Sequence, residues 1–228
     1  MKSVHWTSRD LDILPDDGTR YEIIEGELYI SKQPHKYHQL VSGRIWILLQ
    51  TWSLQTGLGE AVIAPGIIFS EDNDVVPDVT WMSKERLAMA YQDDGKYHVA
   101  PDLAVEILSP GPTNERRDRE FKLWLYSRRG ILEYWIINWM EQRLEIYRRD
   151  ETHLTLHNTL FRDDTVRSPH LPGFSCKVSQ FFEDVIASRP LPLLKRLLPK
   201  TLHLSRDILI CRLIIIPVPP IVGLQKHP

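Results

Sequence analysis

The sequence predicts an α/β fold (α+β) in which a mixed β-sheet is flanked by helices. Residues 103–108 form a nearly continuous apolar run between Pro101 and Pro110, which is typical of a strand covered on both faces. A second such run covers 131–137, and the segment between the two runs has a helical pattern that Gly130 can end. Strand, helix and strand in this order predict a right-handed crossover between parallel strands.

The preceding half of the chain predicts a hairpin, several short strands and a long helix. Glu25-Gly26 is a two-residue hairpin turn between apolar segments. Residues 36–56 carry apolar side chains at helical spacing, and Gly57 follows them. The other expected elements are helices at 8–14 and 84–90, strands at 21–24, 27–31, 61–64, 66–70 and 75–81, and a turn at 72–74.

The segments after the strand–helix–strand block predict a simpler arrangement. We expect an antiparallel edge from residues 143–148, 153–157 and 165–168, followed by a short helix at 180–187.

Length and composition indicate one main domain and a distinct end. With 228 residues, of which 43% are hydrophobic and 25% charged, we expect a domain over 1–187 and a basic, Pro/Leu/Ile-rich tail of uncertain structure over 188–228. Arg212 and Pro217 interrupt the apolar end of that tail, so we expect no membrane span. No signal peptide opens the sequence and the two cysteines match no metal spacing, so we expect a reducing, cytoplasmic location.

Charge is distributed unevenly. Residues 187–228 contain seven Lys or Arg against one Asp, which leaves 21 basic against 29 acidic residues in the remainder. An acidic main domain is not the usual footprint of a nucleic-acid binder. Positive charge that could contact nucleic acid is nevertheless concentrated in the predicted helix between the two buried strands. The basic residues of this helix are Arg116, Arg117, Arg119, Lys122, Arg128 and Arg129.

Acidic residues occupy positions where a core would favour apolar ones. Glu106 interrupts the first buried strand, where an ionised carboxylate is costly unless it is paired or holds a metal. The structural alternative is an ion pair with a helix arginine. Asp78 follows a proline within a β-branched run, and its structural alternative is an Asx turn. Asp102 lies about 13 Å from Glu106 along the strand, so one ion cannot bind both.

Asp118 and Lys122 are spaced i, i+4 on a helix face that also carries Tyr126. A surface ion pair is the plain interpretation of this spacing. The chemical interpretation is phosphodiester hydrolysis, which needs a divalent ion to stabilise charge and activate water. Mg²⁺ takes one or two carboxylates, and a lysine can stabilise the developing charge. Asp78, Glu106 and Lys122 are the candidates for this set.

The order of these motifs resembles a known family. The sequence is similar to the Uma-type putative restriction endonuclease family, which is abundant in cyanobacteria, was formerly classed as a domain of unknown function, and resembles the PD-(D/E)XK nuclease superfamily. The resemblance covers roughly residues 8–186. It rests on YEIIEGEL at 21–28, His38, VPDV at 76–79, PDLAVEILSP at 101–110, Asp118, Lys122, Tyr126 and GILEYWII at 130–137.

The resemblance implies a restriction-endonuclease-like fold with Asp78 and Glu106 as metal ligands. The superfamily lysine stands two residues beyond the second carboxylate, where this sequence has Leu108. This difference from the superfamily pattern is consistent with a catalytic lysine on the following helix, where Lys122 would take the role of the missing residue. The further candidates implied are Glu25 or Glu27 as an additional metal contact, His38 beside a ligand or facing the phosphate, and Asp118.

The function expected from the residues and the resemblance is a Mg²⁺- or Mn²⁺-dependent endonuclease that hydrolyses DNA. Restriction enzymes usually act as symmetric dimers, so a homodimer is expected by analogy. The first alternative is a catalytically inactive nuclease-fold protein that binds nucleic acid or another partner. The second is a hydrolase acting on another substrate, for which no G-x-S-x-G, H-E-x-x-H or Gly-rich phosphate loop is present.

Overall fold

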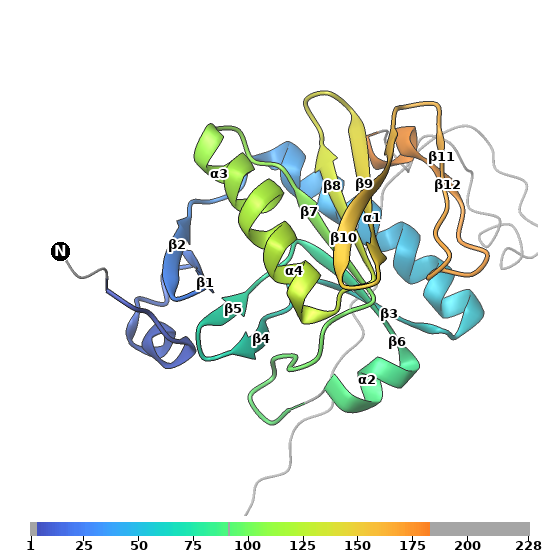
Figure 1. Ribbon diagram of the computed structural model, residues 1–228. Coiled ribbons are helices and arrows are strands. Elements are labelled where there is room, and N and C mark those ends of the chain that lie inside the picture. The colour runs from blue at the N-terminus through green and yellow to red at the C-terminus, as the bar shows by residue number, and fades with distance from the viewer. Residues whose placement is uncertain (1–3, 91, 183–228) are drawn as a thin grey trace, which may run out of the picture. The chain divides into compact units, whose positions relative to one another are not determined.

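The computed structural model describes residues 4–90 and 92–182, and a six-stranded sheet forms the centre of this part of the chain (Figure 1). The sheet order is β10-β9-β8-β7-β6-β3. β7 and β8 pair in parallel, and every other neighbouring pair in the sheet is antiparallel. The predicted mixed sheet is therefore confirmed. Its strands are β3 (Gly59–Ile63), β6 (Val79–Ser83), β7 (Leu103–Ile107), β8 (Glu133–Asn138), β9 (Arg143–Asp150) and β10 (His153–Leu160).

The connection from β7 to β8 is the predicted helix, but its middle is wound differently. It runs as α3 (Pro112–Arg116), a π-helical segment η2 (Arg117–Lys122) and α4 (Leu123–Arg129). Gly130 ends it with φ of 85°, as expected, because glycine adopts the left-handed conformation without steric cost. π-Helical turns are uncommon and occur frequently at functional sites. Here the π-helical segment carries Lys122.

A second sheet of four strands has the order β2-β1-β5-β4. Its hairpin turn is the predicted one, with positive φ at both Glu25 (52°) and Gly26 (76°). Residues 73 and 74 were expected in a turn but form β5 together with Val75, and the strand expected at 75–81 is interrupted at residues 76–78. Asn73 and Asp74 tolerate burial there because the Asn73 amide bonds Glu25 and Asp74 lies 2.7 Å from the ammonium of Lys96. The strands are β1 (Arg20–Ile24), β2 (Glu27–Ser31), β4 (Ile67–Ser70) and β5 (Asn73–Val75).

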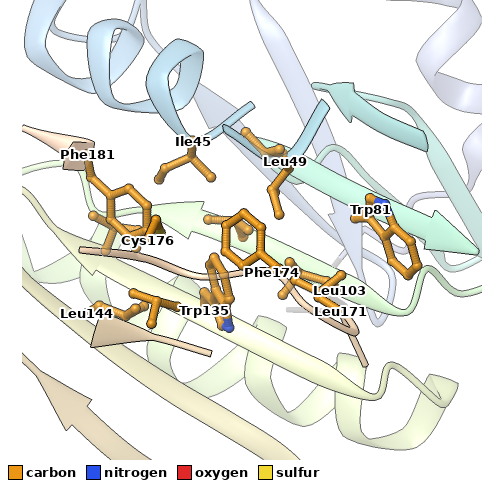
Figure 2. Packing of buried hydrophobic residues seen from close by; sticks show 14 of the residues in the cluster. Ile45, Leu49, Trp81, Leu103, Trp135, Leu144, Leu171, Phe174, Cys176 and Phe181 are labelled. Atoms are coloured by element: carbon orange, nitrogen blue, oxygen red, sulfur yellow. The ribbon is translucent and has the colours of Figure 1, made fainter. Parts of the chain in front are cut away.

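One face of the six-stranded sheet is covered by α1 (Lys36–Thr56) and by the end of the described chain. Ile45 and Leu49 of α1 meet Trp135 of β8 and Phe174 in this core (Figure 2). Residues 165–168 were expected at the edge of the main sheet. Instead β11 (Thr165–Val166) pairs with β12 (Cys176–Lys177), which brings Cys176 into the same core. The remaining short helices are η1 (Ser8–Ile13), α2 (Lys84–Ala90) and η3 (Val178–Phe181).

The opposite face of the sheet packs against α4 and the four-stranded sheet (Figure 1). Ala104 of β7 and Ile136 of β8 join Tyr126 of α4 and Ile24 of β1 in this second core. Because side chains alternate along a strand, Glu106 points to the same face as Ala104. Its carboxylate is therefore directed into the layer between the two sheets and the helix.

Within the described residues, no helix is long and apolar enough to cross a membrane. The domain boundary expected at residue 187, the tail 188–228 and most of the helix expected at 180–187 lie outside the described residues.

Candidate functional site

Glu106 is the centre of a buried polar cluster. It is 1% exposed, and its Oε1 accepts hydrogen bonds from Nζ of Lys122 at 2.8 Å and from the hydroxyl of Tyr126 at 2.9 Å. The buried strand carboxylate is thus paired with a lysine, not with the arginine of the structural alternative. Asp118 and Lys122 do not form a surface ion pair, because both side chains are fully buried. The charges of this buried cluster are therefore stabilised by these contacts and not by solvent.

Lys122 contacts a second carboxylate that sequence reasoning did not single out. Its Nζ lies 2.7 Å from Oε1 of Glu22, which also accepts a hydrogen bond from the backbone N–H of Val76 at 2.8 Å. Oε2 of Glu22 has no hydrogen-bond partner among the described residues, although Glu22 is fully buried. The signal that marks Glu22 is the one that marks Glu106: an acidic residue next to apolar ones in a short strand. The lysine is consequently held between two strands of different sheets.

Asp78 lies beside this cluster, directly before β6. Its Oδ2 accepts a hydrogen bond from the backbone N–H of Ile107 at 2.8 Å, directly after Glu106 in the chain. Arg20 contacts Oδ1 at 3.0 Å, and Nε2 of His38 lies 3.1 Å from Oδ2. Burial opposes ionisation of Asp78, but its bonds with His38, Arg20 and Ile107 hold its pKa well below the usual range. The structure therefore brings Asp78, Glu106 and Lys122 to one place.

The pKa of Glu106 is shifted in the opposite direction. Burial raises it to about 8; Lys122 opposes the shift, whereas the negative charges of Asp78, Asp118 and Glu22 add to it. Carboxylates outnumber the Lys and Arg side chains in this region. The four carboxylates are Glu22, Asp78, Glu106 and Asp118, and the three cations are Arg20, Arg117 and Lys122. The negative charges exceed the positive ones by one when Glu106 is ionised, and the two balance when Glu106 is protonated.

The other candidate residues fall in different places. Glu25 and Glu27 are exposed and line a separate pocket with Phe121 and Trp124, so the structure does not bring them to the cluster. Glu22 is the carboxylate of this hairpin that lies there. His38 is in the cluster through Asp78. Asp118 is one step removed, because its Oδ1 is bound by Arg117 at 2.8 Å.

The basic residues of the helix are not a free surface for DNA. Most of them are paired with acidic residues within the chain. The pairs are Arg116 with Glu120, Arg117 with Asp118, Arg119 with Glu145, and Lys122 with Glu22 and Glu106. Arg129 bonds Ser70, and Arg128 lies over the ring of Trp124. The local positive charge expected from this helix is therefore largely neutralised.

Asp78 and His38 form the floor of a cleft of about 220 Å³. Arg20, Lys32 and Arg117 line its sides. Asp78 is the cluster carboxylate that reaches this cleft, whereas Glu106 does not line it. Leu108, at the position where the resemblance led us to expect the superfamily lysine, is fully buried among apolar residues. The only ammonium in contact with Glu106 among the described residues is that of Lys122.

The donor set suits a hard divalent ion in part. No group of three or more His, Cys, Asp or Glu side chains within the described residues is arranged to hold a metal ion. Mg²⁺ usually keeps several waters and is bound through one or two carboxylates, so Asp78 and Glu106 are sufficient in kind and number. Oε2 of Glu22, which accepts no hydrogen bond within the described residues and lies 3.9 Å from a guanidinium nitrogen of Arg117, is a further buried oxygen in the same cluster.

Comparisons with known proteins identify the family and the fold of the chain. The sequence pattern of the Uma2 family, described as putative restriction endonuclease, matches residues 9–179. A putative nuclease of the DUF820 group from Anabaena variabilis ATCC 29413 has the same fold, with a TM-score of 0.60 and 21% identity over 77% of this chain and 97% of that chain. The type IIG restriction endonuclease BpuSI aligns with a TM-score of 0.37 and 14% identity over 67% of this chain and 16% of that chain, which is too distant to carry an argument. No curated protein matches.

Proposed function

The chain belongs to the Uma2 family of putative restriction endonucleases, and we propose that it is a Mg²⁺- or Mn²⁺-dependent endonuclease that hydrolyses phosphodiester bonds of DNA. The observation that carries this proposal is the position of Lys122, whose ammonium lies 2.8 Å from Glu106 of β7. Asp78 is close by, because it accepts a hydrogen bond from the backbone N–H of the next residue in β7, Ile107. Metal-dependent phosphodiester hydrolysis requires carboxylates and a positively charged group, and here two carboxylates from neighbouring strand segments meet a lysine of the helix.

Each residue has a distinct role in this proposal. Asp78 and Glu106 would hold the ion, which when bound stabilises charge on the phosphate and activates a water molecule. Lys122 directs positive charge at the attacking water or the developing phosphate charge. Glu22 and Tyr126 are positioning residues, because Glu22 fixes the ammonium and Tyr126 fixes the carboxylate that it contacts.

Arg20 and Arg117 line the cleft above Asp78 and are suited to a phosphate group. A guanidinium presents several N–H donors in a planar fork, which matches the oxygens of a phosphodiester. Arg20 already contacts Asp78 at 3.0 Å, so it would have to share its charge between that carboxylate and a bound phosphate.

A cleavage assay with purified protein tests the proposal. Plasmid and oligonucleotide DNA are incubated with Mg²⁺ or Mn²⁺ and with the wild-type protein, Asp78→Asn or Glu106→Gln. The matched control is Glu27→Gln, which neutralises an exposed carboxylate of the hairpin outside the cluster. We expect cleavage by the wild type and the control only. Equal cleavage by the wild type and Glu106→Gln would rule out the proposed chemistry.

One observation favours a second candidate, an inactive nuclease-fold module that binds nucleic acid or another partner. Both oxygens of Asp78 are already engaged, Oδ1 by Arg20 and Oδ2 by His38 and Ile107, so a metal ion would have to compete for them. This candidate predicts that the wild-type protein binds DNA in EDTA and leaves it intact with every divalent ion. The same cleavage assay therefore separates the two functions.

A further inference from the structure

A second hollow continues from the cleft that contains Asp78. It has a volume of about 520 Å³ and lies between the loop after β2 and the loop after β7. Lys32, Ser109 and Arg117 line both the hollow and the cleft, so the two spaces adjoin. A substrate strand that reaches Asp78 can therefore extend into this hollow.

A group of three aromatic rings adjoins the hollow through His35. The ring of His35, which lines it, stacks on Trp139 with centroids 5.2 Å apart and an angle of 5° between the planes. Tyr37 packs against both rings at 5.4 and 5.5 Å. Two hydrogen bonds fix the group: Nε1 of Trp139 donates to the carbonyl of Leu108, and Nδ1 of His35 accepts from the backbone N–H of Tyr37. The rings are thus ordered in advance of any ligand.

These rings remain accessible, since His35 is exposed and Tyr37 is 47% exposed. Cationic and polar groups surround them. Lys32 lines the hollow and forms no ion pair within residues 4–90 and 92–182, and the ammonium of Lys36 lies 5.0 Å from the Tyr37 ring centroid. Gln33 supplies an amide. Stacking surfaces beside a positively charged groove are what proteins use to bind single-stranded nucleic acid.

The dimensions favour an unpaired strand over a duplex. Asp78 is 4% exposed at the floor of its cleft, and Glu106 behind it is 1% exposed. A DNA duplex is stiff over many base pairs, so bringing one of its phosphates to carboxylates this deeply buried costs deformation energy that a flexible single strand avoids. An extended single strand can place a phosphate in the cleft and the adjoining base in the hollow.

We infer that the hollow formed by the Lys32–Tyr37 segment and the Ser109–Asn114 loop binds an unpaired nucleotide, so that the substrate is single-stranded or locally unpaired DNA. The base stacks on the ring group of His35, Tyr37 and Trp139, and Lys32 contacts the neighbouring phosphate. This inference rests on the proposed function. It also removes the need for two copies of the chain at one duplex site, because a single strand is cut by one site.

Binding in EDTA tests the inference apart from catalysis. Fluorescence anisotropy compares a labelled single-stranded oligonucleotide with the same sequence as a duplex, and 2-aminopurine in the single strand reports stacking. We expect single-strand binding at least ~10-fold tighter than duplex binding, and an affinity loss on the order of 10-fold in Tyr37→Ala. Tyr37→Phe keeps the ring and should bind as the wild type does. The matched control is Trp124→Ala, which removes a similarly exposed ring from a different pocket.

The outcomes separate the inference from the proposed function. Equal or tighter binding of the duplex, no binding of either DNA, or equal affinities of Tyr37→Ala and Trp124→Ala would each overturn the inference. In those cases the comparison of the wild type with Glu106→Gln still decides the endonuclease proposal. Preferential single-strand binding that depends on Tyr37, without metal-dependent cleavage, would support the inference and reject the endonuclease.

Discussion

Lys122 and Glu106 are sixteen residues apart in the chain, and Nζ of the lysine lies 2.8 Å from Oε1 of the glutamate in the buried layer between helix and sheet. The same ammonium lies 2.7 Å from Glu22 of the other sheet. A lysine that is fully buried is stable only while such partners compensate its charge. This relationship joins the stability of the fold to the chemistry of the proposed site.

Lys122→Met should therefore affect both properties. Removing one partner of a buried ion pair leaves an uncompensated charge, so we expect the free energy of unfolding to fall by about 3 kcal/mol. Cleavage should be lost. Urea unfolding and the plasmid assay measure the two effects. In the double variant Lys122→Met/Glu22→Gln, part of the stability should return while cleavage stays absent. Cleavage by Lys122→Met at the wild-type rate would remove the lysine from the proposed mechanism.

The raised pKa of Glu106 predicts the pH dependence of stability in the metal-free protein. The folded-state pKa of about 8 lies above the ordinary value of 4.5, so the folded state keeps a proton that the unfolded state releases. This contribution is complete below pH 4.5 and is lost as the pH rises toward 8. We expect the unfolding free energy in EDTA to decrease between pH 5 and 8, by at most about 1.4 kcal/mol per pH unit.

Glu106→Gln is the control for this pH dependence, because the amide does not titrate. Urea unfolding at several pH values should give a flatter profile for this variant than for the wild type. Parallel profiles for the two proteins would show that Glu106 does not carry the titration.

Addition of a divalent ion should release protons near pH 7. If Glu106 is partly protonated in the metal-free protein, a cation that binds its carboxylate displaces that proton. Isothermal titration with Mn²⁺ in two buffers of different ionisation enthalpy measures the number released. We expect release by the wild type, less by Glu106→Gln, and a higher melting temperature of the wild type with the ion. Binding without proton release would contradict the role given to Glu106.

Two glycines offer a matched test of the fold. A Cβ at Gly59 would lie 2.2 Å from the carbonyl oxygen of Met82 and 2.6 Å from the ring of Trp81, so Gly59→Ala should destabilise the protein. Gly43, inside α1, has nothing within 4 Å of an added Cβ, and Gly43→Ala should raise the unfolding free energy by about 0.5–1 kcal/mol. Urea denaturation measures both. Changes of the same sign would contradict this view of the packing.

Local sequence pattern determined the elements that short-range physics controls. The helix 36–56 and its closing Gly57 follow from apolar spacing and a left-handed cap. The Glu25-Gly26 turn follows from the backbone that a two-residue hairpin requires. The parallel strands on either side of the 112–129 helix follow from two buried apolar runs. The presence of Glu106 in one of these runs marked the candidate site.

The tertiary structure alone decided that Glu22 joins the charged groups around Lys122. Glu22 and Lys122 are a hundred residues apart and come from different layers, so no local period relates them. The π-helical segment carries both Asp118, which pairs with Arg117, and Lys122, which donates to Glu106. The sequence shows which charged residue will be buried, because its neighbours in the strand are apolar and the strand is covered on both faces. Its partner is set by the packing of distant elements, because a charge out of water must be compensated by whichever groups the fold brings within reach.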